Sequence, residues 1–137
     1  MKIYFAYTIR GDRSRIETAK EIVNMLKEKG HDVMTEIFLS DNAEDNNGLS
    51  GKEIFNRNIG WLGACDVIVS EVSGSSFGIG YEIGYILGGT DKKAFILFES
   101  NASPKISLMA TANTHKNAVI CSYDNLGGIR KFIDEHF

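Results

Sequence analysis

Hydrophobic and polar positions follow two periods along the chain, one typical of buried strands and the other of amphipathic helices. Short continuous apolar runs bounded by turn residues predict strands, and apolar residues at spacings of three and four predict helices. The apolar runs predict five strands, at residues 2–7, 32–38, 67–72, 93–99 and 117–123. Helical spacing predicts helices over 14–30, over 52–62, across 79–87 and after 126, with a short helical turn near 106–112.

Two sequence signals mark the ends of the first helix. Ser14 and Glu17 have the spacing of a capping box, which predicts the helix start, and Gly30 is a natural C-terminal stop.

The alternation of strands with helices predicts an α/β fold in which a parallel sheet is covered on both faces. We expect one domain over residues 1–137, a doubly wound, flavodoxin-like sheet of five strands in the order 2-1-3-4-5. In that order, the turns after strands one and three converge.

Residues 66–89 carry the most informative pattern, a strand followed by a Ser/Gly-rich turn and then a helix. Small residues let backbone amides approach a ligand, and the first amides of a helix have no internal partners. This arrangement favours an anion site. We expect Glu82 in the first helical turn, where the positive end of the helix dipole favours the ionised carboxylate that a nucleophile requires.

The turn after strand one supplies a cation and a hydroxyl, in Arg10 and Thr8. With Ser75, Ser76 and the amides from Gly78 onward, these groups suit a phosphate. Two plainer interpretations stay open at this point. Glycines here also permit tight packing of strand against helix, and an arginine in a turn is often simply solvated.

Two further features allow two interpretations each. Asn58 lies on the apolar face of its predicted helix, so its amide either bonds neighbouring backbone or reaches into a pocket. The polar segment 40–51 is expected to be a mobile loop, either a plain connection or a lid over the site.

Composition narrows the function classes. A net charge of −3 with dispersed basic residues leaves no footprint for polymeric nucleic acid or an anionic membrane, although a small anionic ligand remains compatible. Cys65 and Cys121 are interpreted as buried, reduced thiols, and there is no signal-peptide pattern, so we expect a cytoplasmic protein. The three histidines are dispersed without zinc-site spacing, and the first turn lacks Walker spacing.

Several motifs together resemble the nucleoside 2-deoxyribosyltransferase family, and within it the branch of 2′-deoxynucleoside 5′-phosphate N-hydrolases. The resemblance covers nearly the whole chain. The motifs that carry it are Ile3-Tyr4-Phe5-Ala6, Thr8-Ile9-Arg10-Gly11, Val33-Met34-Thr35-Glu36, Trp61-Leu62, Asp66-Val67, Phe77-Gly78-Ile79-Gly80-Tyr81-Glu82-Ile83-Gly84 and Ser107-Leu108-Met109.

The resemblance implies a small nucleotide as substrate, a glutamate nucleophile that forms a glycosyl-enzyme, and no metal or other cofactor. It implies a homodimer, because a serine of one subunit reaches the phosphate bound by its partner. By this resemblance, the catalytic positions are Glu82, Tyr4 and Asn58; the phosphate contacts are Thr8, Arg10, Ser76, Gly78 and Ser107; and the sugar and base pocket includes Tyr7, Ile9 and Gly80.

The chain departs from the family pattern at two of these positions. Asn58 stands where the family has a second carboxylate, and Tyr7 replaces a small residue. An asparagine can hydrogen-bond but cannot carry charge or take up a proton at neutral pH. The leading hypothesis is therefore an N-glycosidase acting on nucleoside 5′-monophosphates, with a base-exchanging transferase and a non-catalytic nucleotide-binding module as alternatives.

Overall fold

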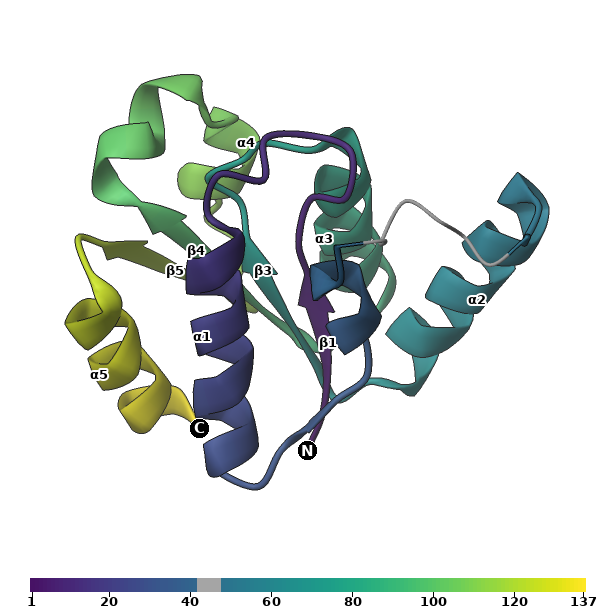
Figure 1. Ribbon diagram of the computed structural model, residues 1–137, viewed down its shortest axis with the longest axis horizontal. Helices are drawn as coiled ribbons and strands as arrows, with labels where there is room; N and C mark the ends of the chain where they lie inside the picture. Colours follow the sequence, from purple (N-terminus) through teal and green to yellow (C-terminus); the bar gives the residue numbers. More distant parts are fainter. Residues whose placement is uncertain (42–47) are drawn as a thin grey trace.

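The computed structural model describes residues 1–41 and 48–137, without the side chains of 103–105, and contains one five-stranded sheet (Figure 1). All neighbouring strands are parallel, and the order is β2-β1-β3-β4-β5, which confirms the predicted doubly wound topology. The strands are β1 (Lys2–Ala6), β2 (Asp32–Val33), β3 (Val67–Glu71), β4 (Lys93–Glu99) and β5 (Ala118–Tyr123).

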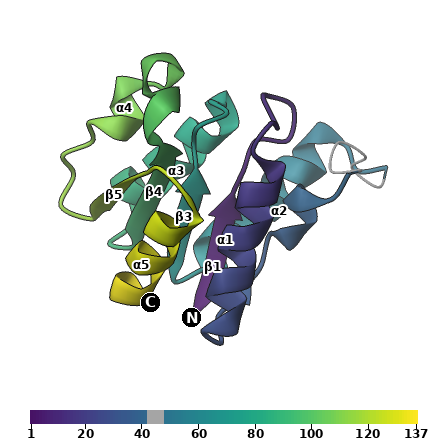
Figure 2. The ribbon, with the colours of Figure 1, turned by 60° about the vertical axis from the view of Figure 1, so that its left-hand side comes forward.

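Helices cover both faces of this sheet, as the views in Figures 1 and 2 show. One face is packed by α1 (Ile16–Glu28) and α5 (Leu126–His136), and the other by α2 (Gly51–Ala64) and α3 (Phe77–Gly89). Short helical pieces complete the chain: η1 (Glu36–Leu39), η2 (Ser100–Lys105) and α4 (Leu108–Thr111). Within the part of the chain that the structure describes, no helix is long and apolar enough to cross a membrane.

The pleat of β1 decides which side chains reach which face. Ile3 and Phe5 enter the core under α1 and α5, whereas Tyr4 and Ala6 enter the core under α2 and α3. Successive strand residues point to opposite faces, so this alternation follows directly from strand geometry. Tyr4 is therefore directed toward the helix that carries Glu82.

The second strand is much shorter than predicted, since only Asp32 and Val33 pair with β1. The cause is the side chain of Thr35. Its hydroxyl accepts a hydrogen bond from Phe5 N at 2.8 Å and donates one to Phe5 O at 2.7 Å, replacing the ladder contacts that a longer strand would make. The chain is then free to turn into η1 across the top of β1.

Helix ends differ from prediction in two places. The predicted capping box at Ser14 is wrong: α1 begins at Ile16, and Ser14 N instead donates to the Asp12 carboxylate at 2.9 Å. A capping box does occur at the start of α2, between Ser50 and Glu53. The predicted stop at Gly30 is confirmed, because this residue has a φ of +81° just after α1.

Two other expectations concern the region before and within α2. Residues 42–47 of the predicted loop and lid lie outside the described residues. The helical spacing of Ile54, Phe55, Ile59 and Leu62 predicts one buried apolar face on α2, yet Phe55 is 52% exposed. It lies over an open cavity between α2 and α3, so amphipathic spacing alone overestimated how closely α2 packs. Both cysteines are buried free thiols, as predicted.

Candidate active site

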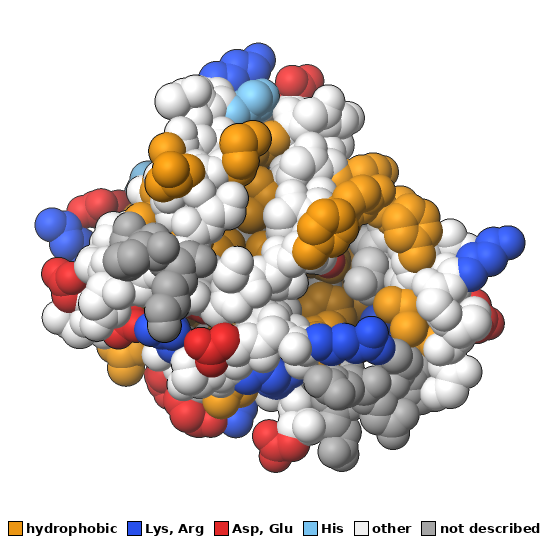
Figure 3. All heavy atoms as spheres, turned by 90° about the horizontal axis from the view of Figure 1, so that it is seen from above, with side chains coloured by type: hydrophobic (Ala, Val, Ile, Leu, Met, Phe, Trp, Pro, Cys, Tyr) orange, Lys and Arg blue, Asp and Glu red, His pale blue; other side chains and the backbone are white. Residues whose placement is uncertain are grey.

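A cleft of about 450 Å³ opens at the carboxyl edge of the sheet, where the turn after β1 meets the start of α3. Figure 3 looks onto this edge and shows a hollow with hydrophobic side chains on its floor and basic side chains beside it. In doubly wound folds, ligands bind at this edge, at the point where the strand order reverses. The cleft is lined by Tyr7, Ile9, Arg10, Phe38, Gly51, Ile54, Asn58, Ser76, Gly78, Ile79 and Glu82.

The two turns that form the cleft pack closely against each other. A β-carbon added to Gly11 would lie 3.1 Å from Ser75 O in the second turn, and one added to Gly74 would lie 2.2 Å from Asp12 O in the first. Only glycine fits at the distance found for Gly74. The predicted convergence of the turns after β1 and β3 is thus confirmed by direct contact.

Glu82 lines the cleft, whereas Tyr4 is fully buried and contacts Glu82 from behind the cleft wall. The Tyr4 hydroxyl, on β1, donates a hydrogen bond of 2.6 Å to Glu82 Oε1, on α3. Burial raises the pKa of the Glu82 carboxyl to about 7, and the hydrogen bond from Tyr4 opposes part of that rise. The pKa of Tyr4 is also raised, first by its own burial and then by the nearby carboxylate. Tyr4 therefore remains a proton donor in its hydrogen bond at every physiological pH.

The expected influence of the helix dipole on Glu82 is wrong. Because α3 begins at Phe77, Glu82 is not in the first turn, which contains no acidic residue. Dipole effects fall off within that turn. Burial in the cleft, rather than the helix end, sets the ionisation of this carboxyl.

The expected phosphate residues do not all lie together. Arg10, Ser76 and Gly78 line the cleft, whereas Thr8 is only 1% exposed. The Thr8 hydroxyl accepts a hydrogen bond of 2.9 Å from Gly11 N, so it shapes the turn and does not face the cavity.

Ser107 and Gly80 also lie outside the cleft. Both line a neighbouring cavity of about 180 Å³ between α3 and α4, together with Ser76, which borders both spaces. Ser107 caps α4, where its hydroxyl accepts a hydrogen bond from Met109 N at 3.3 Å. Leu108 and Met109 beside it are 74% and 85% exposed. The side chain of Ser107 therefore stands on an exposed apolar surface next to the cleft.

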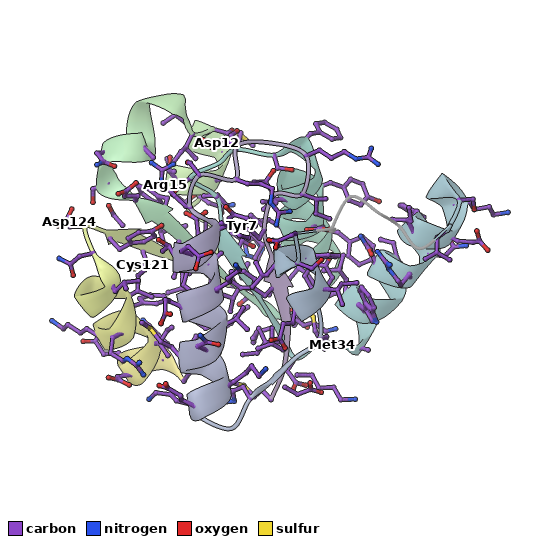
Figure 4. All side chains as sticks on the ribbon, viewed as in Figure 1. Tyr7, Asp12, Arg15, Met34, Cys121 and Asp124 are labelled. Carbon is purple, nitrogen blue, oxygen red and sulfur yellow. The ribbon has the colours of Figure 1, made fainter. Side chains whose placement is uncertain are left out.

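The expected base-pocket residues Tyr7 and Ile9 do line the cleft. The Tyr7 hydroxyl, however, is buried on the opposite side and has no hydrogen-bond partner in the described structure. Burial and the nearby Glu71 carboxylate raise the pKa of Tyr7 to about 12. Figure 4 shows Tyr7 near the upper end of α1, beneath the turn that carries Asp12. The ring of Tyr7 thus walls the cleft while its hydroxyl faces the protein interior.

Sequence reasoning missed a buried network under the second turn. Glu71, 1% exposed at the end of β3, accepts hydrogen bonds from Ser73 N at 3.1 Å, from the Ser73 hydroxyl and from the Tyr123 hydroxyl at 3.0 Å. Burial raises the pKa of Glu71 despite these contacts. Ser73 Oγ in turn accepts from Glu99 N at 2.8 Å. This network fixes the turn that leads to Ser76, and only its long-range partners reveal it.

Arg13 was also missed, although it contacts the backbone of two residues that line the cleft, Ile9 and Phe38. Its guanidinium donates to the carbonyl oxygens of Phe38 and Ser40, both at 3.2 Å, and weakly to Ile9 O at 3.5 Å. These bonds tie the turn after β1 to the segment that follows β2. No spacing in the sequence signals such a contact.

Asn58 faces the cleft from α2, which answers the question that its sequence position left open. It is half-buried, and its Oδ1 accepts a hydrogen bond of 3.2 Å from Arg57 Nε. Asn58, Gly78 and Glu82 also border a second, apolar cavity of about 290 Å³ between α2 and α3. Among the described residues, no group of three or more His, Cys, Asp or Glu side chains could hold a metal ion.

Comparison with known proteins identifies the family. The profile of the nucleoside 2-deoxyribosyltransferase family matches residues 3–119. The chain belongs to the nucleoside 2-deoxyribosyltransferase family. A family relative from Thermofilum pendens, provisionally named 2′-deoxynucleoside 5′-phosphate N-hydrolase 1, is 35% identical over 127 residues, covering 92% of this chain and 87% of its own.

Two further proteins extend the comparison. The 5-hydroxymethyl-dUMP N-hydrolase of Danio rerio is 38% identical over 113 residues, covering 80% of this chain and 76% of its own. The structure of a CMP N-glycosidase from Clostridium botulinum superposes with a TM-score of 0.71 at 18% identity, with full coverage of both chains. At that identity the likeness shows the shared fold. The two sequence relatives described above are both named as nucleotide N-hydrolases.

Proposed function

We propose that the protein hydrolyses the bond between base and sugar in nucleoside 5′-monophosphates, with Glu82 as the nucleophile. The observation that carries the proposal is the pairing of Glu82 with the buried Tyr4 by a hydrogen bond of 2.6 Å, at the wall of a cleft that Arg10 also lines. A half-buried carboxylate and an arginine cation that line one cavity suit a substrate that has an electrophilic carbon and an anionic end. The names of the N-hydrolase relatives point to the same substrate class.

Three groups are suited to the 5′-phosphate. The Arg10 guanidinium can form paired, charge-assisted hydrogen bonds, and the Ser76 hydroxyl and the Gly78 amide lie at the N-terminus of α3. A phosphate held there places the sugar over the middle of the cleft, near Glu82. The base then lies against the apolar side chains of Ile9, Phe38 and Ile54.

The reaction proceeds in two displacements. The ionised Glu82 carboxylate attacks the anomeric carbon, the bond to the base nitrogen breaks, and the electron pair leaves with the base. Water then attacks the same carbon, the ester bond to Glu82 breaks, and the carboxylate is restored as the water proton passes to solvent. Both steps invert the anomeric carbon, so the product retains the original configuration.

The raised pKa suits this role. With a pKa of about 7, Glu82 is ionised in a large share of molecules at neutral pH, yet it is more basic than an exposed glutamate. The hydrogen bond from Tyr4 favours the ionised form and fixes the attacking geometry. Attack by the carboxylate oxygen that Tyr4 leaves free then requires no rearrangement.

Completion of the site by a second subunit is part of the proposal. Ser107 lies beside the cleft but not in it, on a surface that exposes Leu108 and Met109. An isologous dimer would cover this apolar surface and carry Ser107 to the phosphate of the partner. We therefore expect a homodimer with composite sites.

Incubation of the purified protein with a panel of ribo- and deoxyribonucleoside monophosphates, with chromatography of free base, tests the function. Release of base from monophosphates and not from the matching nucleosides is the expected result. Addition of a second free base distinguishes hydrolysis from base exchange, since a transferase would form the new nucleotide. Thermal stabilisation by nucleotides without any base release would instead identify a non-catalytic binding module, the alternative that Asn58 raises.

A further inference from the structure

We infer that Arg57 is a positioning residue, which holds the Asn58 amide so that Asn58 donates a hydrogen bond to the departing base. This inference rests on the proposed function and assigns a role to a residue that no motif singled out. It also explains how the site works with an amide at a position where the family has a carboxylate.

The contact between the two side chains fixes the orientation of the amide. Arg57 Nε lies 3.2 Å from the Asn58 side chain. A guanidinium has donors and no acceptor, so the Asn58 atom that it contacts must be the carbonyl oxygen Oδ1. The amide nitrogen Nδ2 is thereby turned away from Arg57, and within the described structure it has no other hydrogen-bond partner.

Arg57 is itself held in place. Its guanidinium carbon lies 4.7 Å from the centre of the Trp61 ring, one turn further along α2. Trp61 packs edge-on against Phe38, with ring centres 6.2 Å apart. The cation–π contact and the packed ring together limit the rotamers open to Arg57. The orientation of the amide is therefore set before any substrate binds.

The free Nδ2 group lies where a base would leave. Asn58 lines the cleft together with Glu82, and both residues border the second cavity as well, whereas Arg57 lines neither cavity. An N–H group in the cleft wall can meet the acceptor atom beside the glycosidic nitrogen. That atom is a keto oxygen in pyrimidines and a ring nitrogen in purines.

Such a contact would favour the reaction without transferring a proton. When Glu82 attacks, the electron pair of the breaking bond moves onto the base, and negative charge builds up on the acceptor atom. The hydrogen bond from a fixed donor strengthens as that charge develops. The donor therefore stabilises the transition state more than the bound substrate. The base then takes up its proton from water after the bond has broken.

The test compares two leaving groups on one sugar phosphate. The first is a natural deoxynucleoside monophosphate, and the second is 4-nitrophenyl 2-deoxyriboside 5-phosphate, whose phenolate leaves readily without a hydrogen-bond donor. Arg57→Met removes the guanidinium but keeps an unbranched stem over Trp61. Lys52→Met, an exposed position on the same helix, is the matched control for loss of charge.

We expect Arg57→Met to lower kcat for base release about 10- to 100-fold, less than the ~100- to 1000-fold cost of deleting a transition-state donor, because the Asn58 amide itself remains. Its release of nitrophenolate should stay within about 3-fold of wild type, and Lys52→Met should leave both rates unchanged. Asn58→Ala should show the same split between substrates. Arg57→Gln, which retains an N–H donor, should recover part of the loss.

An equal loss with both substrates in Arg57→Met and Asn58→Ala would overturn the inference. It would mean that the two residues act on the sugar or on Glu82, and not on the departing base. Unchanged base release in both variants would overturn it as well. Failure of the proposed function looks different, since the wild-type protein would then release neither base nor nitrophenolate.

Discussion

Replacement of Glu82 by glutamine separates the catalytic role of this residue from its effect on stability. Glutamine keeps the shape of the side chain and an oxygen that can accept the hydrogen bond of 2.6 Å from Tyr4. It removes the charge and the nucleophile. Base release should fall by several orders of magnitude, as expected when the group that forms the covalent bond is lost.

The same substitution should stabilise the fold at alkaline pH. Burial moves the Glu82 pKa from its ordinary value of 4.5 to about 7. Above pH 7 the carboxyl is ionised in both folded and unfolded states, so the folded state carries the full cost of burying the charge, about 3 kcal/mol. Below pH 4.5 the carboxyl is protonated in both states, and this cost disappears.

Thermal unfolding of the wild-type and Glu82→Gln proteins at pH 8 and at pH 4.5 measures this difference. One kcal/mol corresponds to roughly 3 °C in a domain of this size, so the Gln variant should melt up to about 9 °C higher at pH 8. The gap should close toward pH 4.5. Equal midpoints at pH 8 would refute the reasoning that burial controls this carboxyl, and a Gln variant with most of the wild-type rate would refute its role as nucleophile.

Four other substitutions test separate parts of the site and the fold. Arg10→Ala should weaken the binding of nucleoside monophosphates by about 1.5–3 kcal/mol, measured by inhibition, and leave the binding of nucleosides nearly unaffected. Equal losses for both ligand classes would mean that Arg10 does not contact phosphate. Tyr4→Phe removes a hydrogen bond that lowers the Glu82 pKa, so the acid limb of kcat/KM should move to higher pH; an unmoved limb would contradict the pairing. Ser107→Ala subunits mixed with Glu82→Gln subunits should regain activity, because one site of each heterodimer is intact, and a monomer at assay concentration would exclude this. Thr35→Val should cost about 2–3 kcal/mol in urea unfolding, since it leaves buried main-chain groups of β1 without partners.

The fold was predictable because local periodicity and topology agree. Apolar runs marked the strands, and the sheet order brought the turns after β1 and β3 into contact, as Gly11 and Gly74 show. The short second strand was not predictable, because the hydroxyl of Thr35 takes over the ladder contacts of a residue 30 positions away. A threonine within an apolar run is otherwise typical of a β-strand.

The centre of the site was predicted better than its surroundings. The motifs of the chain placed Tyr4 and Glu82 in one site, and the structure brings their side chains together. The ionisation of Glu82 was misjudged, because burial depends on how α2 and α3 pack and not on position along a helix. Glu71 was missed because its hydrogen bond with Tyr123 joins residues 52 positions apart. Arg57 was missed because a contact with the adjacent residue Asn58 leaves no periodic signal in the sequence.

The central claim is that the sugar becomes covalently attached to Glu82 during the reaction. Rapid acid quenching of the protein with a deoxynucleoside monophosphate, followed by peptide mass spectrometry, measures this directly. We expect a deoxyribose 5-phosphate adduct on the peptide that contains Glu82, in the wild-type protein and not in Glu82→Gln. Release of base without any adduct at Glu82, or with an adduct at another residue, would contradict the mechanism.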